Sequence, residues 1–342
     1  MSVYRVGILG LHHDHVWDHF PDLLKSEQVE LVGAADPNQE LLDKAEKYVG
    51  QGYRDYLDLL EAELPDAVLI FSSNRGGADL AVTALERGVH VMIEKPMAAD
   101  LVGADAMLAA AEVGKARLMV NWPFAWQPAL QRGIELALAG EIGRLWQVRY
   151  RAAHRGPEEL GCTAFFCEWL FDEHLNGGGA LMDYCCYGSV LARVLLGQPE
   201  QVMGVEGRFR KAPVGVEDNA ILVMSYPAGM AIAEASWSEV GSLTAYVTAI
   251  HGEDGTILVE PGSGGRLIKA TLGDSQGREL DASDPPPELR SGTAHFLWGI
   301  ETGEKYMPLC DPVNCRDAQA ILGAGRRSAR SGSGVAMGER AY

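Results

Sequence analysis

The stretch YRVGILGLHHDHVWDHF, residues 4–20, decides the fold. Its apolar run Tyr4–Leu9 ends at Gly10, and Val16 and Phe20 then recur at helical spacing. An apolar run, a glycine and a helix in this order are typical of the strand, tight turn and helix that begin a nucleotide-binding domain. The stretch also contains four of the chain's nine histidines, so it raises a second possibility, a metal centre. These histidines are His12, His13, His15 and His19.

Strand and helix patterns alternate through the first third of the chain. Short apolar runs end in glycine or polar residues, and amphipathic or Ala-rich segments follow them. This alternation predicts an α/β Rossmann domain over residues 1–121, with a doubly wound parallel sheet covered by helices. The expected strands are 4–9, 29–35, 67–71, 90–93 and 117–121, and helices are expected after 16, over 39–48, around 78–87 and over 100–113.

The pattern changes after residue 121. A helix is expected over 128–139, and from residue 145 most segments alternate in polarity or carry β-branched and aromatic residues. Turn sequences such as YPAG at 226–229 separate them. This predicts a C-terminal α+β domain over residues 122–342, with a mainly antiparallel sheet that helices cover on one face. A further helix, 310–328, is expected to pack back on the first domain.

Composition narrows the class of protein. The chain has 342 residues, 47% hydrophobic and 22% charged, with a formal net charge of −18. An acidic surface argues against nucleic acid and anionic membranes as partners. No apolar run approaches the roughly 18 residues of a membrane helix, and no signal peptide is expected at the N-terminus. The six cysteines form no CxxC pair, which favours free thiols in a reducing, cytoplasmic compartment.

The predicted phosphate turn departs from the usual glycine pattern. In G-x-G-x-x-G, the glycines permit the turn, close approach to pyrophosphate and packing of the helix on the strand. Gly10 occupies the first place, whereas His12 and His15 occupy the second and third. The helix that follows still offers backbone amides to an anion. We expect Gly10 to keep the turn and His12 or His13 to contact phosphate, with His15 replacing the packing glycine.

Polar residues follow the next two strands, where a ligand of a parallel sheet binds. Asp36 ends the second strand and can accept hydrogen bonds from ribose hydroxyls, which favours NAD over NADP because no basic residue follows directly. Ser72, Ser73 and Asn74 follow the third strand and are also expected to face the dinucleotide. The alternatives are a turn-forming aspartate before proline and an ordinary polar loop.

Two further segments carry a family resemblance. The stretch ALERGVHVMIEKPMAAD, residues 84–100, resembles the E-K-P hallmark of the glucose–fructose oxidoreductase, inositol dehydrogenase and rhizopine catabolism family. The stretch GGGALMDYCCYGSVLARVLLG, residues 177–197, resembles that family's substrate helix. Most members carry a histidine where Tyr187 stands in this chain. The branch that resembles dihydrodiol dehydrogenase carries a tyrosine there, as this chain does. Cys185, Gly77 and Pro123 depart from the family pattern, as does the phosphate turn.

The resemblance implies an NAD(P)-dependent oxidoreductase that transfers a hydride between nicotinamide and a sugar, polyol or related cyclic alcohol. It places Glu94, Lys95 and Asn121 at the cofactor, with Lys95 between nicotinamide and substrate. Tyr187 is expected to act as acid and base, its pKa lowered by the Lys95 ammonium. Asp183, four positions earlier on the same helix face, is expected to bind a substrate hydroxyl. Family members commonly form homodimers or homotetramers through the open sheet face, so the same is expected here.

Several residues keep two interpretations. His174 and His154 are candidates for the substrate pocket or ordinary surface and loop residues, and Trp122 lines the pocket or packs in the core. A metal site of His12, His15 and His19 is possible by helical spacing, but its place at a phosphate turn favours anion contact, so no metal is expected. A non-catalytic sensor on the same fold is the other alternative, and the presence of Asp36, Lys95 and Tyr187 together argues against it.

Overall fold

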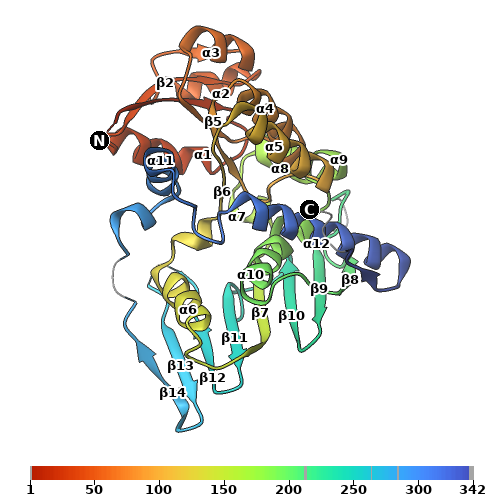
Figure 1. Ribbon diagram of the computed structural model, residues 1–342. Helices are drawn as coiled ribbons and strands as arrows, with labels where there is room; N and C mark the ends of the chain where they lie inside the picture. The colour runs from red at the N-terminus through yellow and green to blue at the C-terminus, as the bar shows by residue number, and fades with distance from the viewer. Residues whose placement is uncertain (1, 212–213, 263, 283–284, 339–342) are drawn as a thin grey trace.

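A computed structural model describes residues 2–211, 214–262, 264–282 and 285–338 as two domains, one above the other in Figure 1. The first contains a six-stranded parallel sheet in the order β3-β2-β1-β4-β5-β6. This confirms the doubly wound prediction. Its elements are β1 (Tyr4–Leu9), α1 (Val16–Lys25), β2 (Val29–Ala35), α2 (Gln39–Ala45), β3 (Gly52–Tyr53), α3 (Tyr56–Glu63), β4 (Ala67–Ile70), α4 (Asn74–Glu86), β5 (His90–Glu94), α5 (Leu101–Gly114) and β6 (Leu118–Asn121).

The sequence patterns predict this sheet well because its central strands are apolar and covered on both faces. All four residues of the central strand β4 are buried, and so are those of the edge strand β6. Helix starts follow side-chain caps: Ser73 accepts a hydrogen bond from the amide of Gly76, and Asp100 accepts one from Gly103. Two elements, β3 and α3, were not expected. A strand of two residues is too short to show a period.

The second domain is built on a nine-stranded sheet in the order β14-β13-β12-β11-β7-β10-β9-β8-β15. All neighbours are antiparallel except β7 and β10, so the prediction of a mainly antiparallel sheet is confirmed. The strands are β7 (Leu145–Ala153), β8 (Gln201–Gly207), β9 (Asn219–Tyr226), β10 (Gly229–Ser236), β11 (Val247–Gly252), β12 (Gly255–Val259), β13 (Leu267–Thr271), β14 (Asp274–Leu280) and β15 (Val335–Ala336).

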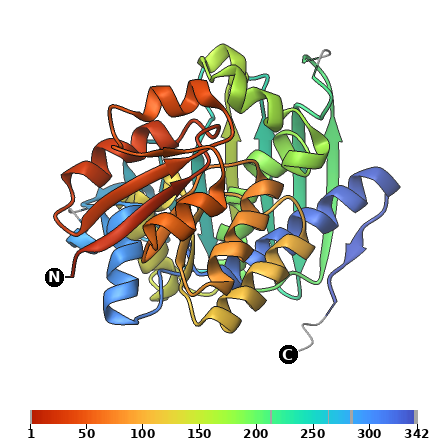
Figure 2. The same cartoon turned by 90° about the horizontal axis from the view of Figure 1, so that it is seen from above.

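The helices of this domain pack on its sheet, and one of them also contacts the first domain. Helices α6 and α10 pack on the strands of the second sheet, and α12 packs on β8 and α10 while also contacting α5 and β6 of the first domain. Figure 2 shows α12, in blue, crossing the strands. The helical segments are η1 (Pro123–Trp126), α6 (Pro128–Leu138), α7 (Pro157–Leu160), α8 (Ala164–Leu170), α9 (Glu173–Asn176), η2 (Leu181–Cys185), α10 (Cys186–Leu196), η3 (Pro287–Leu289), α11 (Gly292–Thr302) and α12 (Pro312–Ser331).

The helical stretch 173–196 connects the site to the core. By length and composition it is the one described stretch that could cross a membrane, but 72% of its most apolar window is buried inside the protein. Such burial is the property of a core helix. Within it, η2 is a single π-helical turn that precedes α10, a distortion of the kind found at functional sites. The turn carries Asp183 into the space between the domains, as described below.

Candidate active site

The turn after β1 has the backbone of a phosphate turn. Gly10 has φ +87°, and a Cβ atom there would lie 2.6 Å from the carbonyl oxygen of Phe71, so only glycine fits. The amide of Gly10 donates to the carbonyl oxygen of Ala35 at 2.8 Å. Within the described residues, the amides of His12 and Asp14 have no acceptor. Two free amides at the start of α1 are suited to an anion.

His12 links the carboxyl ends of three strands. Its Nδ1 donates to Asp36 Oδ2 at 3.1 Å, and its Nε2 accepts from the amide of Ser73 at 3.1 Å and lies 3.0 Å from Ser72 Oγ. Because Nε2 accepts from an amide, the hydrogen of the neutral ring is on Nδ1. Asp36 Oδ2 also accepts from the amide of Leu11 at 2.7 Å. The predicted residues Asp36, Ser72 and Ser73 therefore lie together around the His12 ring.

The second domain covers the histidine-rich turn. The amide and hydroxyl of Thr163 both donate to the Asp14 carboxylate at 2.7 Å, and Trp169 Nε1 donates to the carbonyl oxygen of His12 at 3.2 Å. The ring of His13 packs edge-on against Phe166, with centroids 4.9 Å apart. Burial lowers the pKa of His13 well below its usual value, so this imidazole is neutral. Helix α8 thus lies over the turn.

Glu94, at the end of β5, is surrounded by nitrogen atoms. His15 Nδ1 lies 3.0 Å from Oε2, His19 Nε2 lies 3.5 Å from Oε1, and Asn121 Nδ2 donates to Oε1 at 2.6 Å. Burial raises the pKa of Glu94, but His15 and the other neighbours outweigh it and hold the pKa well below its usual value. Glu94 is therefore an anion inside the protein. Trp126 Nε1 fixes Asn121 by donating to its Oδ1 at 2.8 Å.

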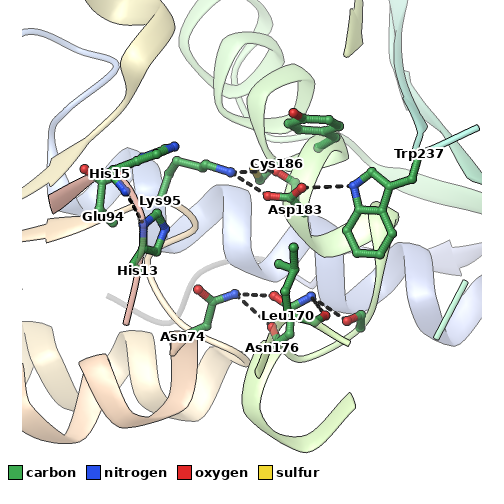
Figure 3. A network of polar contacts seen from close by, with 12 residues as sticks. His13, His15, Asn74, Glu94, Lys95, Leu170, Asn176, Asp183, Cys186 and Trp237 are labelled. Atoms are coloured by element: carbon green, nitrogen blue, oxygen red, sulfur yellow. Dashed lines mark hydrogen bonds and ion pairs between the residues drawn. The ribbon is translucent and has the colours of Figure 1, made fainter. Parts of the chain in front are cut away.

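Lys95 and Asp183 form a buried ion pair between the domains. Lys95 Nζ lies 2.6 Å from Asp183 Oδ1 and donates to the Asp183 carbonyl oxygen at 3.2 Å, while Trp237 Nε1 donates to Oδ2 at 3.1 Å (Figure 3). Burial lowers the pKa of Lys95, but the Asp183 carboxylate more than offsets this and the pKa lies above its usual value. The lysine is thus a protonated ammonium.

Tyr187 contacts Lys95 through its ring. The ammonium lies 5.1 Å from the ring centroid of Tyr187 and 5.4 Å from that of Tyr184. Burial raises the pKa of Tyr187 well above 10, so the expected lowering by Lys95 is wrong. The physical reason is that the low-polarity surroundings penalise the phenolate more than one neighbouring ammonium, already paired with Asp183, favours it. The phenol stays protonated at neutral pH.

The remaining predicted residues lie around this centre at different depths. Asn74 donates to the carbonyl oxygen and side-chain oxygen of Asn176, 2.9 and 2.7 Å away, and so joins the two domains. Trp122 packs edge-on against Tyr187 and donates to Cys315 Sγ. His154 is buried beside Tyr184, and burial lowers its pKa to about 4. His174 is exposed on α9.

Sequence reasoning did not identify three residues that hold this centre together. Trp237 bonds Asp183, Asn176 bonds Asn74, and Thr163 bonds Asp14. Trp237 ends the strand pattern AIAEASW, and Asn176 directly precedes the glycine run at 177–179, so both lie next to recognisable motifs. Nothing in the sequence around Thr163 indicates its partner, because the contact joins residues 149 positions apart.

A cavity of about 320 Å³ opens beside Glu94, between α1, η1 and the segment that enters α11. Thr293, one of its lining residues, is 5% exposed, and its hydroxyl oxygen has no hydrogen-bond partner among the described residues. The cavity reaches the carboxyl end of β6 at Asn121. It is lined by His15, Asp18, His19, Asp22, Asn121, Pro123, Trp126, Arg290, Ser291, Gly292 and Thr293.

Both domains match models of known families. Residues 4–122 match the oxidoreductase family with an NAD-binding Rossmann fold, and residues 131–258 match the GFO/IDH/MocA C-terminal domain. The first match defines a class, the oxidoreductases that bind a nicotinamide dinucleotide on a Rossmann domain. The two matches together cover most of the chain, and the protein belongs to the GFO/IDH/MocA oxidoreductase family, as the motifs at 84–100 and 177–197 indicated.

Individual relatives agree with this assignment. D-xylose 1-dehydrogenase (NADP(+)) 2 of Haloferax volcanii is 27% identical over 97% of this chain and 99% of its own length. Myo-inositol 2-dehydrogenase of Thermotoga maritima is 22% identical over 77% of this chain and 74% of its own. An Agrobacterium radiobacter oxidoreductase in complex with NAD⁺, L-tartaric acid and magnesium shares the fold, with a TM-score of 0.83, 19% identity and 98% coverage of both chains.

Proposed function

We propose that the protein is an NAD(P)-dependent dehydrogenase that transfers a hydride between nicotinamide and a CH–OH group of a sugar, polyol or related cyclic alcohol. The observation that carries this proposal is the buried Lys95–Asp183 pair between the two domains, one residue beyond the end of β5. Burying two charged groups costs desolvation free energy, which favours a functional role for the pair. The pair also lies at the end of the parallel sheet where ligands of a Rossmann domain bind.

The first domain fits a dinucleotide with one adjustment. The turn at Gly10 and the free amides of His12 and Asp14 are suited to pyrophosphate. Asp36 is at the right strand end for ribose, but its carboxylate already accepts from Leu11, His12 and Asn38. A carboxylate has about four acceptor sites. Three of these sites are occupied, so one is left for the two ribose hydroxyls. The second hydroxyl would therefore replace the His12 hydrogen bond, and the His12 ring would turn away from Asp36.

Side chains of this protein would transfer the proton of the substrate hydroxyl. The dinucleotide supplies the hydride chemistry when bound. Lys95 Nζ, held by Asp183 Oδ1, would donate to the substrate oxygen and stabilise negative charge that develops there. In the oxidation direction, Lys95 would pass one proton to Asp183, which Trp237 Nε1 holds in place, and would take the hydroxyl proton instead. The protonated Tyr187 phenol remains a candidate donor in the direction that reduces a carbonyl.

The substrate class rests on the relatives and on the polarity of the centre. The relatives include enzymes named for xylose, apiose, inositol and levoglucosan, all of them polyhydroxylated. Such substrates need several hydrogen-bonding side chains, which Lys95, Asp183, His154 and Tyr184 provide between the domains. The deciding experiment is a dehydrogenase screen across sugars and polyols with each dinucleotide. Binding of neither NADH nor NADPH would contradict the proposal and favour the sensor alternative.

NAD is expected to be preferred over NADP. The Asp36 carboxylate repels a 2′-phosphate, so fluorescence titration is expected to show NADH binding about tenfold more tightly than NADPH, or about 1.4 kcal/mol. Asp36→Ser is expected to weaken NADH and remove this preference. Asp43→Ser, at an exposed carboxylate on α2, is the control and should change neither affinity. Equal affinities in the unaltered protein would contradict the proposed role of Asp36.

The open face of the second sheet is proposed as a homodimer or homotetramer interface in a cytoplasmic protein. Val205 and Ile221 lie opposite each other on β8 and β9 and are 68% and 45% exposed. Replacing both with glutamate is expected to convert the oligomer to monomer in light scattering, because two charges would be buried without partners. The matched control is Val102→Glu on α5, where the side chain is 78% exposed. A wild-type monomer would contradict this proposal.

A further inference from the structure

We propose that His13, His15 and Glu94 form a binding site for one divalent transition-metal ion of the Zn²⁺ or Co²⁺ type. One ligand atom from each residue lies within 4.8 Å of the others, so the three possible ligand atoms are close together (Figure 3). His15 Nδ1 and Glu94 Oε2 are already 3.0 Å apart. No part of this inference depends on dinucleotide binding.

The donor set matches the chemistry of such an ion. Two imidazole nitrogens and one carboxylate oxygen are a common set for catalytic zinc, and imidazole also suits cobalt, nickel and iron. In a tetrahedral site with bonds of about 2.0–2.1 Å, ligand atoms are about 3.3 Å apart. The 3.0 Å between His15 and Glu94 is close to this value. His13 and His15 lie in the turn between β1 and α1, and Glu94 is the last residue of β5.

Bonded neighbours hold the carboxylate ligand in place. Asn121 Nδ2 donates to Glu94 Oε1 at 2.6 Å, and Trp126 Nε1 holds Asn121 in turn. This is the outer layer that orients metal ligands. It leaves Glu94 Oε2 for the ion and places Oε1 beside His19 Nε2, 3.5 Å away. Glu94 is 5% exposed, so a dication would compensate a carboxylate that is out of water.

The geometry selects a different histidine set from the one that helical spacing suggested. His12 is turned to the opposite side, where its two ring nitrogens contact Asp36 and Ser73. His13 takes its place, because consecutive residues of the turn point in different directions. Three protein ligands leave a coordination position open. His15 borders the 320 Å³ cavity, so water or a hydroxyl oxygen of a small molecule would complete the coordination from that side.

The test uses the full chain without an affinity tag, freed of metal by a chelator and then titrated with Co²⁺. One equivalent is expected to bind and to give visible d–d absorption, which Zn²⁺ then removes. His15→Ala and Glu94→Gln should each weaken binding at least tenfold and abolish the absorption. His251→Ala, on β11 beside Thr256, is the matched control and should bind like the unaltered protein.

Two further variants separate the ligand sets. His13→Ala should lose the cobalt absorption, and His12→Ala should keep it. Far-ultraviolet circular dichroism checks each fold, and His15→Ala is the most secure variant because that side chain is one-third exposed, at 33%. Absence of stoichiometric binding would overturn the proposal, as would unchanged binding in His15→Ala. Loss in His12→Ala with retention in His13→Ala would overturn the ligand set.

Discussion

Lys95→Ala is expected to lower kcat/KM by about a thousandfold. The variant removes the group that moves the substrate's proton, an effect of about 10²–10⁴ in other enzymes, and the donor that stabilises the developing charge on the substrate oxygen, an effect of about 10²–10³. Dinucleotide binding should persist, because Gly10, Asp36 and the free amides lie apart from Lys95. Steady-state kinetics with the best substrate of the screen and fluorescence titration with NADH measure the two quantities.

Lys269→Ala is the control for this result. Its ammonium pairs with Glu141 at 2.7 Å, far from the candidate site, and kcat/KM should stay within twofold. If Lys95→Ala retained turnover within tenfold of the unaltered enzyme, Lys95 would have no part in the reaction. Loss of NADH binding together with turnover would instead indicate that the lysine holds the cofactor.

Asp183→Asn is the second large effect, with an expected loss of about a hundredfold in kcat/KM. Asp183 is the group that raises the pKa of Lys95 against the effect of burial. Without it burial remains, so the lysine pKa falls and Lys95 loses its proton at lower pH than before. The limb of the pH profile that requires protonated Lys95 should therefore move to lower pH. Stability should fall by about 3 kcal/mol in denaturant unfolding, because the buried ammonium has lost its partner.

Trp237→Phe separates pairing from positioning. It removes only the indole donor to Asp183 Oδ2 and keeps the Lys95–Asp183 bond, so the pH profile should hardly move while kcat falls modestly. A profile that is unchanged in Asp183→Asn would contradict the assigned coupling. In that case, the effect of Asp183→Asn would be a loss of packing alone.

Much of the fold follows from local patterns. The strands at 4–9 and 29–35 end at the predicted residues because apolar runs stop at Gly10 and Asp36. The E-K-P and glycine-run motifs also indicated that Lys95 and Asp183 lie in one site. Lys95 directly follows β5, and Asp183 lies in η2, just after the glycine run. What local patterns miss is short or distant. The two-residue β3 has no period, and Thr163 meets Asp14 only through the chain's three-dimensional path.

The candidate site also depends on directions and surroundings that sequence does not contain. Helical spacing grouped His12 with His15, but the turn before α1 is not helical and points them apart. The pKa of Tyr187 was expected to fall because an ammonium is near. Its ring is enclosed by Trp122, Phe124 and Tyr150, and that enclosure has the larger effect. Burial of this kind becomes known only when the packing is.

The clasp of α8 over the phosphate turn bears on the timing of ligand exchange. Thr163 holds the Asp14 carboxylate, and Trp169 holds the carbonyl oxygen of His12, in the two residues whose amides an anion would reach. We expect a ligand to reach these amides when both contacts are open, so that its residence time follows the opening rate of the α8 contacts rather than the intrinsic strength of phosphate binding. Such openings occur in microseconds to milliseconds in other enzymes. Opening of the α8 contacts would then limit the rate of turnover.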